Sequence, residues 1–332
     1  MTKTMTTTWK HFLGTALAAT ACGASAIHAA DPAANYPQRP VRIISPFSAG
    51  GNSDIVGRLI APKLSERLGQ NVIVENRSGA GGAIGTNYVA KATPDGYTML
   101  IPSGAFTAVA ATVPKLPYDS VRDFTWVSMV VTYPFVMVVR NDSLIRSVGD
   151  YIAAAKKSPG KLTYGSVGTG SVFHLAAELV NSMAKTETTH VPYKGGGDSM
   201  TDVMGGRIDA VFTTMTGAWP QIEAKRVRAV AVASRERLPQ MPGVPTIAET
   251  LPGYEVISFA GLGVPRGTPP AVVARLNKEV RAVLADPDIQ KRLTDMGGQV
   301  TPTSPEEMRR HVEGEIAKWK RLVAERKIEV VN

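Results

Sequence analysis

The sequence predicts a two-lobed α/β protein in which two segments cross between the lobes and a ligand cleft lies between them. Short β-branched runs alternate with helical patterns along the chain, which is typical of parallel sheets with crossover helices. This alternation occurs in two series, one before and one after residue 140. A later strand-like segment returns toward the first series, so the chain crosses twice, and a cleft between such lobes is a common ligand site.

The chain begins with a predicted secretion signal, residues 1–30. Lys3 and Lys10 form its positive region, the apolar run 12–21 is too short to span a bilayer, and small residues suited to signal peptidase follow. Cys22 is the only cysteine, so ordinary cleavage leaves a mature chain with neither a thiol nor a disulfide. The alternative is a lipoprotein in which Cys22 carries the lipid. Export to the periplasm is expected in either case.

The first series is expected to read β-α-β-α-β. Its strands are predicted at 41–44, 71–75 and 97–101, and its helices at 55–68 and 83–91. Gly69 is expected to end the first helix. The segment 126–140, rich in Val, Met, Tyr and Phe, is expected to lead out of this lobe as one or two strands.

The second series is expected to build the other lobe. Its helices are predicted at 148–157, 171–183 and 200–204, and its strands at 162–164, 189–193, 208–212 and 227–233. These strands do not alternate between apolar and polar residues, which indicates burial on both faces. A strand at 255–264 crosses back, and helices at 270–285, 288–296 and 305–325 close the chain. Lobe 1 is therefore expected at 31–137 with 256–332, and lobe 2 at 138–255.

Length and charge limit the function classes. After cleavage about 300 residues remain, which suits two domains, and no later stretch of roughly 18 apolar residues appears. The formal charge falls from +9 to +7, because two lysines leave with a signal that holds no acids. Lys and Arg are scattered rather than clustered, so nucleic acid is not an expected partner, whereas a mildly positive body favours anionic ligands.

Two strand-to-helix turns predict an anion site. The turn 46–54 places backbone N–H groups at a helix start, where the partial positive charge favours an anion and glycines allow a ligand to approach. The turn 165–171 does the same in the other series and adds Ser and Thr hydroxyls. Each turn alone fits a capped helix as well, and Asp54 fits a first-turn acid better than a ligand contact. Their presence in both lobes favours binding.

Enzyme signals are few. The segment 79–85 and the turn 165–170 depart from the dinucleotide fingerprint, and no acid ends the strand at 97–101, so an NAD-dependent oxidoreductase is a distant alternative. No nucleophile elbow or paired-carboxylate motif stands out, so no catalytic residue is assigned. The mature chain has three histidines without metal-ligand spacing, so no metal is expected. His174 is expected either to face the cleft or to be a structural histidine.

Six segments carry a resemblance to a known family, in the expected order from Tyr36 to the last helix. They are YPQRPVRII at 36–44, the turn 46–54, VENR at 74–77 with GAGG at 79–82, PDGY at 94–97, KLPYD at 115–119 and VPYKG at 191–195. These segments resemble the Bug family, the extracytoplasmic solute receptors of tripartite tricarboxylate transporters.

The resemblance implies a periplasmic binding protein fold, type II-like, without cofactor or turnover. It implies a monomer that captures a small carboxylate, whether a di- or tricarboxylate, an amino acid or an aromatic acid, for a membrane permease. A co-receptor that presents its ligand to a sensor kinase is an alternative. The ligand carboxylate is then held, partly through water, by 47–52 and 166–171.

The turn 103–106 and residues 213–215 lie at expected strand ends and are expected to face the cleft and add specificity. Phe259 is expected either to contact the ligand or to have a core or hinge role, and Lys194 to act as a counter-charge. The residues expected to bind the ligand are Phe47, Ser48, Ala49, Gly50, Gly51, Asn52, Asp54, Ser103, Gly104, Ser166, Gly168, Thr169, Gly170, Ser171, His174, Thr213 and Phe259.

Overall fold

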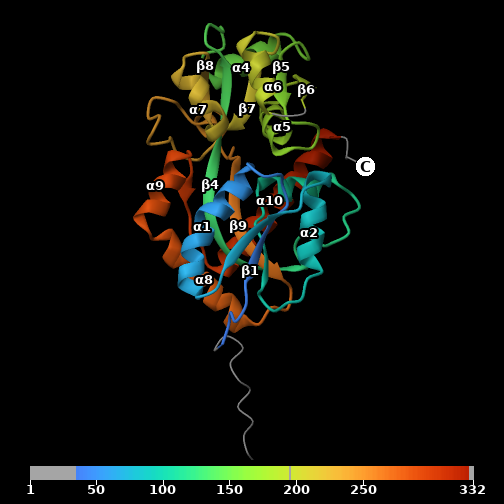
Figure 1. Ribbon diagram of the computed structural model, residues 1–332. Coiled ribbons are helices and arrows are strands. Elements are labelled where there is room, and N and C mark those ends of the chain that lie inside the picture. The colour runs from blue at the N-terminus through green and yellow to red at the C-terminus, as the bar shows by residue number, and fades with distance from the viewer. Residues whose placement is uncertain (1–34, 194–195, 329–332) are drawn as a thin grey trace, which may run out of the picture. The chain divides into compact units, whose positions relative to one another are not determined.

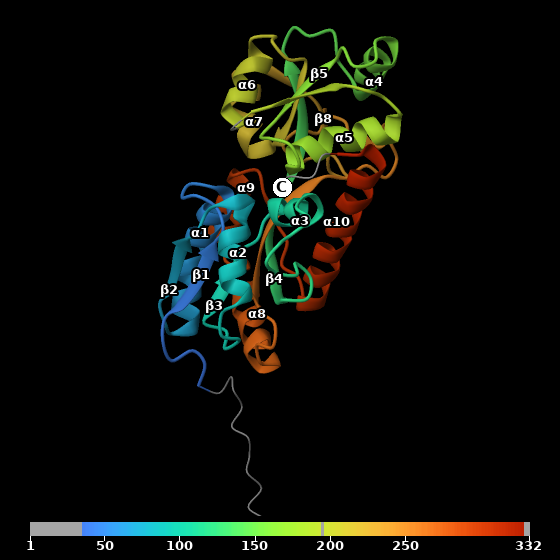
Figure 2. The same cartoon turned by 90° about the vertical axis from the view of Figure 1, so that its right-hand side faces the viewer.

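Two lobes, each with a sheet covered by helices on both faces, make up the chain (Figures 1 and 2). The computed structural model describes residues 35–193 and 196–328. The predicted secretion signal, Cys22 and Lys194 lie outside these residues. The α/β architecture with two lobes is as the sequence predicts.

One long strand, β4 (Phe124–Arg140), runs through both lobes. In lobe 1 it pairs antiparallel with β9 (Ile257–Pro265), and in lobe 2 it pairs with strands on both of its sides. Its residues are buried except for Thr125 and Arg140, because helices cover both faces of the sheet. The segment expected as one or two strands is therefore a single crossing strand.

The sheet of lobe 1 has the strand order β2-β1-β3-β9-β4. Besides β4 and β9 its strands are β1 (Val41–Ser45), β2 (Val72–Asn76), β3 (Thr98–Leu100) and the short β10 (Gln299–Val300), which pairs with β4. One face packs against α1 (Asn52–Leu68), α8 (Pro270–Leu284) and α9 (Pro287–Asp295). The other face packs against α2 (Ala83–Ala90), α3 (Gly104–Thr112) and α10 (Pro305–Arg326).

The sheet of lobe 2 has the order β4-β7-β5-β6, with β8 also paired to β4. Its strands are β5 (Thr163–Ser166), β6 (Thr189–Pro192), β7 (Ala210–Thr214) and β8 (Val227–Val232). One face packs against α4 (Val148–Lys157) and α5 (Val172–Ala184). The other face packs against α6 (Gly196–Met204) and α7 (Met215–Glu223). Two short 3₁₀ turns, Ala80–Gly82 and Ile247–Glu249, complete the elements.

The returning segment makes the second crossing. The Val256 N–H donates to the Ala233 carbonyl and the Phe135 N–H donates to the Val256 carbonyl, which holds this segment beside lobe 2. The next residue starts β9, which runs beside β4 through lobe 1. The boundaries expected for the lobes stay a prediction.

Helix α10 adds a connection that the sequence interpretation does not include. Its first half, with Met308 and Val312, packs in the core of lobe 1. Near its end, Trp319 and Leu322 pack in the core of lobe 2. This helix therefore contacts both lobes and limits how they move relative to each other.

A largely buried ion pair fixes the end of α10 on lobe 2. Arg326 Nε donates to Glu178 at 2.9 Å, and Arg326 Nη1 contacts Glu187 at 3.0 Å. Glu178 also accepts from the Tyr164 hydroxyl at 2.7 Å and from the Asn181 amide at 3.0 Å. Burial alone would raise the pKa of Glu178, but the bonds from Tyr164 and Arg326 outweigh it and hold this pKa below its usual value.

We expect Arg326→Met to lower the free energy of unfolding by about 2 kcal/mol, because the substitution leaves a buried carboxylate without its counter-charge. Arg321→Met is the control, since Arg321 lies 3.9 Å from Glu325 in an exposed pair and should change stability by less than about 0.5 kcal/mol. Urea unfolding of both variants measures the difference. Equal losses in the two variants would contradict the assignment.

The sequence interpretation misses two helices, and it places the starts of α1 and of α6 (Gly196–Met204, expected at 200–204) too late. Residues 103–106, expected as a turn, open α3, whose N-cap Ser103 accepts from the Ala105 N–H at 3.3 Å. Helix α7 follows β7 directly, with Thr214 as N-cap and no glycine-rich turn to mark it. Helix α1 begins at Asn52, three residues earlier than expected, and Gly69 ends it as predicted.

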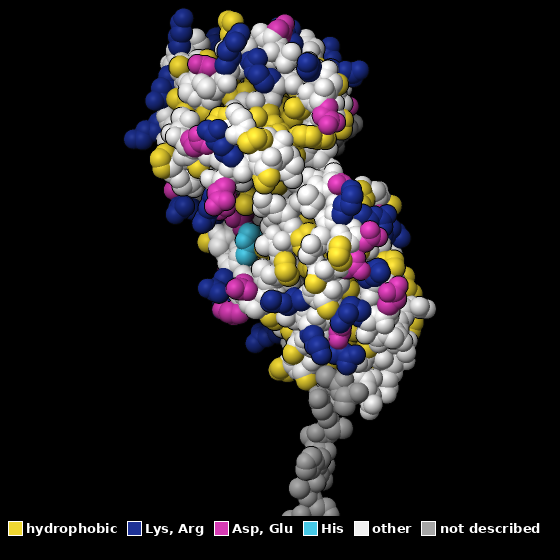
Figure 3. Space-filling view, turned by 90° about the vertical axis from the view of Figure 1, so that its left-hand side faces the viewer, with side chains coloured by type: hydrophobic (Ala, Val, Ile, Leu, Met, Phe, Trp, Pro, Cys, Tyr) yellow, Lys and Arg dark blue, Asp and Glu magenta, His cyan; other side chains and the backbone are white. Residues whose placement is uncertain are grey.

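On the face drawn in Figure 3, Lys and Arg side chains are interspersed with Asp and Glu over both lobes rather than gathered in one stripe. None of the helices in the part of the chain that the structure describes is long and apolar enough to cross a membrane.

Candidate ligand cavity between the lobes

The first turn, between β1 and α1, is shaped by a buried acid. The Asp54 carboxylate accepts the Gly50 N–H at 2.9 Å and Arg58 Nε at 2.9 Å. Burial opposes ionisation, but the hydrogen bonds from Arg58 and Gly50 outweigh it, so the pKa of Asp54 lies below its ordinary value. Gly50 has a φ of +78°, which glycine adopts without strain. Asp54 therefore holds the turn in shape and does not line the cavity described below.

The second turn, between β5 and α5, is held by its own side chains. Ser166 Oγ accepts the Gly168 N–H at 3.0 Å, and Ser171 Oγ donates to the Gly168 carbonyl at 2.7 Å while accepting the His174 N–H at 3.3 Å. His174 Nδ1 accepts the Gly170 N–H at 3.0 Å. These hydrogen bonds satisfy polar backbone groups of the turn. Ser166, Gly168 and His174 therefore support the turn without lining the cavity described below.

Two histidines stack beneath the second turn. The His174 and His190 rings lie 4.0 Å apart at 15°, and His190 Nε2 lies 2.6 Å from Ser166 Oγ. Burial lowers the pKa of His174, and burial with the neighbouring His174 lowers the pKa of His190 to about 4. Both rings are therefore neutral at pH 7, which lets His174 Nδ1 act as an acceptor.

We expect the free energy of unfolding to fall as the pH drops from 6.5 toward 4. In this window the unfolded chain protonates His190 while the folded chain keeps it neutral, so folding is opposed by about 1–2 kcal/mol. His311, whose pKa burial also lowers to about 4, adds to the same loss. Urea unfolding at pH 7.0 and 4.5 should show a smaller pH difference in His190→Gln than in the unaltered protein. An unchanged difference would contradict the assignment.

Both turns line one cavity of about 480 Å³, here called the central cavity. Lobe 1 and the crossing strands contribute Phe47, Gly50, Gly51, Asn52, Ser53, Ile55, Ser103, Ala105, Tyr133, Phe135, Ser258 and Met296. Lobe 2 contributes Val167, Ser171, Val172, Phe173, Thr214, Thr216 and Gly217. The two glycine-bearing turns therefore face the same space.

Four helices begin at the central cavity. Ser53 lies in the first turn of α1, Ser103 caps α3, Ser171 caps α5, and Thr214 caps α7, and all four residues line its wall. Two of these helices belong to each lobe. The first N–H groups of a helix have no intrahelical partner, and its N-terminus carries roughly half a positive charge. The cavity thus attracts an anion from both sides.

The lining supplies hydroxyl groups and no charge. None of the lining residues that the structure describes is Lys, Arg, His, Asp or Glu. Ser53 Oγ and the Tyr133 hydroxyl are buried and make no hydrogen bond to the described residues, although Asn52 is a neighbour of Tyr133. Burial raises the pKa of Tyr133, so its hydroxyl stays protonated. Both hydroxyls can donate to a ligand oxygen.

The structure divides the residues expected from sequence into three groups. Those on the wall of the central cavity are Phe47, Gly50, Gly51, Asn52, Ser103 and Ser171. Those on the wall of an adjoining cavity are Thr169 and Gly170, together with Phe47 and Ser171. Those outside both walls are Ser48, Ala49, Asp54, Gly104, Ser166, Gly168, His174, Thr213 and Phe259.

Thr213 and Phe259 are outlying residues on strands, each next to a residue on the wall. Thr213 is buried in β7, whereas Thr214 lines the cavity. Phe259 is 0% exposed and packs edge-on against His311, whereas Ser258 lines the cavity. Successive side chains of a strand point to opposite faces, which explains both differences.

Ala105 and Thr214 lie on the wall and fall within the segments 103–106 and 213–215 that are expected to face the cleft. Other wall residues are not predicted from sequence. The only signal for Ser53 is its place in the first turn, and Tyr133 lies within the apolar run of β4 with nothing to distinguish it. Thr216 lies in α7, a helix that the sequence interpretation misses.

Comparison with known proteins gives consistent matches. A sequence model described as the tripartite tricarboxylate transporter family receptor matches residues 56–328. A UPF0065 protein in the tcbD-tcbE intergenic region of Pseudomonas sp. (strain P51) is 41% identical over 292 residues, which cover 87% of each chain. The structure of R. palustris Rpa4515 with adipate is 38% identical with a TM-score of 0.77, covering 88% of this chain and 99% of that one. MatC (Rpa3494) from Rhodopseudomonas palustris with bound malate is 34% identical with a TM-score of 0.74, covering 87% and 100%.

Proposed function

The chain belongs to the tripartite tricarboxylate transporter receptor family, and we propose that it captures a small carboxylate between its lobes and presents it to the membrane permease of such a transporter. The receptors of this family are periplasmic binding proteins, and the predicted secretion signal supports the same location for this chain. We further propose that it acts as a monomer. The ligand is a dicarboxylate, a tricarboxylate, an amino acid or an aromatic acid.

The observation that carries this proposal is the convergence of four helix N-termini, two from each lobe, on a neutral cavity. A carboxylate placed there accepts N–H groups from α1 and α5, while the Ser53 and Tyr133 hydroxyls offer further donors. Because the positive partial charges come from both lobes, the ligand bridges them and stabilises the arrangement in which both contact it. The adipate and malate bound by the two related structures are both dicarboxylates.

Release to a permease is compatible with such a lining. The charges that hold the ligand are partial charges of backbone groups, and among the described residues of the wall no Lys or Arg forms an ion pair that has to be broken. Micromolar binding requires about 8 kcal/mol, which helix N-termini and hydroxyl donors together with exclusion of water can supply. Solvent can replace these hydrogen bonds as the lobes separate.

Isothermal titration with malate, adipate, citrate, glutamate and benzoate tests the proposal. At least one of these carboxylates should bind and, at 100 times its Kd, stabilise the protein by about 2.7 kcal/mol. Uncharged amides of the same acids serve as controls and should not bind. A panel in which no carboxylate changes either heat or melting temperature would contradict the proposal.

A further inference from the structure

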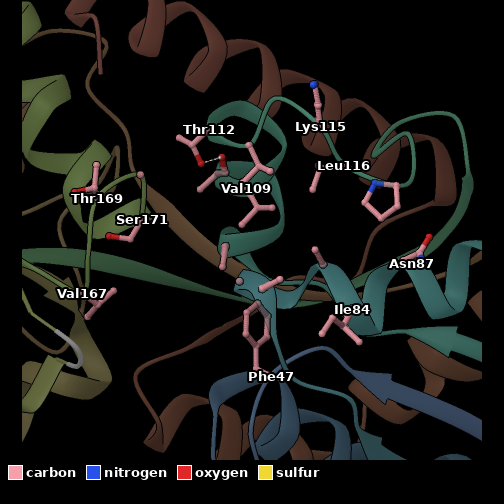
Figure 4. A pocket seen from close by; sticks show the side chains of 18 residues that line it. Phe47, Ile84, Asn87, Val109, Thr112, Lys115, Leu116, Val167, Thr169 and Ser171 are labelled. Atoms are coloured by element: carbon pink, nitrogen blue, oxygen red, sulfur yellow. Dashed lines mark hydrogen bonds between the residues drawn. The ribbon is translucent and has the colours of Figure 1, made fainter. Parts of the chain in front are cut away.

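We propose that the ligand carries an apolar body beside its carboxylate, about as large as an aromatic ring, and that this body occupies a second cavity next to the central one. This inference rests on the proposed function and narrows its ligand class. The second cavity, here called the side cavity, has a volume of about 660 Å³ and lies between α2, α3 and the second turn (Figure 4).

The side cavity adjoins the central cavity. Phe47, Ala105, Val167 and Ser171 line both of them. Ser171 caps α5, so a carboxylate held at that N-terminus stands at the junction. A group attached to this carboxylate therefore enters the side cavity along the Phe47 ring.

The walls of the side cavity are mainly apolar. Ile84 of α2, Val109 of α3, Leu116 and Val167 surround it together with small residues, as Figure 4 shows. Ile84 keeps 57% of its surface exposed on this wall. An apolar ligand group would cover it.

The polar residues on this wall lie mostly at its edges or are already paired. The Thr112 hydroxyl donates to the Ala108 carbonyl at 2.9 Å, so it is satisfied within α3, whereas Asn87 Oδ1 is buried without a hydrogen-bond partner among the described residues. Lys115 is the one charged residue among the described residues of the wall, and its amine extends away from Phe47 in Figure 4. The space next to Phe47 thus offers contacts to carbon rather than to charge.

Close packing fixes the shape of the junction. Gly82 has a φ of +98°, and a Cβ added there would lie 3.1 Å from the Phe47 ring. Gly170 approaches lobe 1 so closely that its added Cβ would lie 3.0 Å from Thr112. These contacts hold the Phe47 ring in place and bound the side cavity where the lobes meet.

A ligand series on the unaltered protein tests the inference. Acetate, butyrate, hexanoate, benzoate and 3-phenylpropionate share one carboxylate and differ in their apolar body, with malate as the small polar reference. Affinity should rise about threefold for each added methylene that is buried, and the phenyl acids should bind at least tenfold more tightly than acetate.

Val109→Trp fills the side cavity from a residue that lines this cavity and not the central one. This variant should lower the affinity for 3-phenylpropionate at least tenfold and change the affinity for malate less than twofold. Ile73→Trp, at an exposed position of β2, is the matched control and should change the affinity for neither ligand. Affinities independent of the apolar body, or equal losses for malate and 3-phenylpropionate in Val109→Trp, would overturn this inference while leaving the proposed function intact. If no carboxylate binds the unaltered protein, the proposed function fails and this inference fails with it.

Discussion

Ser53→Asp is expected to abolish carboxylate binding, with a loss of at least about 100-fold, since like charges brought together in a desolvated site cost several kcal/mol. Ser53 lies in the first turn of α1 on the wall of the central cavity, and its buried hydroxyl has no hydrogen-bond partner among the residues that the structure describes. The new carboxylate would occupy the position proposed for the ligand's own. Folding should survive, because an acid in the first turn of a helix is favourable. Isothermal titration with the tightest ligand measures the loss.

Two control variants separate the effect of a negative charge in the cavity from the effect of losing the Ser53 hydroxyl and from the effect of the protein's net charge. Ser53→Ala removes one donor and should weaken binding by about tenfold at most, the usual value of a single hydrogen bond. Leu144→Asp adds the same charge at a side chain that is 89% exposed and outside both cavities, so it should leave affinity unchanged. If the affinity of Ser53→Asp for the ligand stays within tenfold of that of the unaltered protein, the ligand lies elsewhere.

Gly85→Ala is expected to lower the free energy of unfolding by about 3 kcal/mol, at the upper end of overpacking effects. A Cβ on Gly85 would lie 2.5 Å from the Arg77 carbonyl oxygen and 2.9 Å from Pro46 Cα, and neither backbone atom can move away freely. Helix α2 would have to shift and push the first turn out of place. Ligand affinity should therefore fall together with stability.

Gly314→Ala is the matched control for Gly85→Ala. Gly314 lies within α10, and nothing stands within 4 Å of its added Cβ. Alanine should raise the free energy of unfolding there by about 0.5–1 kcal/mol, because it favours the helix more than glycine does. Urea unfolding compares the two variants. If Gly85→Ala is as stable as Gly314→Ala, this result would contradict the close packing of α2 on the first turn.

This role of Gly85 also explains a pattern that the sequence leaves ambiguous. The glycines at 79–85 suggest a dinucleotide fingerprint with the wrong spacing. In the structure Gly79, Gly81 and Gly82 adopt positive φ in a tight turn, and Gly85 lets α2 pack against backbone. Glycine spacing alone does not distinguish a phosphate-binding turn from close packing, because both need the absence of a side chain.

The lobes and their main strands follow from the sequence, because short β-branched runs separated by helical patterns leave few alternatives. The two glycine turns are also predictable, since a strand, a Gly and Ser turn and a helix recur in order at both. Exact wall residues on strands are harder to predict. An error of one position exchanges the two faces of a strand, and this is how Thr213 is expected in place of Thr214 and Phe259 in place of Ser258.

Contacts between distant segments account for most of what the sequence does not predict. His174 is recognisable as a residue one turn into α5, but the stacked His190 comes from β6 and is fixed only by the pairing of β5 with β6. Tyr133 reaches the cavity because β4 is a single strand through both lobes. Sequence spacing carries no information on such pairs.

The account depends most on a carboxylate that receives hydrogen bonds from both lobes. A crystal structure of the protein with its tightest carboxylate ligand tests this directly. The account predicts carboxylate oxygens within hydrogen-bond distance of first-turn N–H groups of α1 and α5, and near the Ser53 hydroxyl. A ligand bound outside the central cavity, or contacting only one of these two helices, would contradict it.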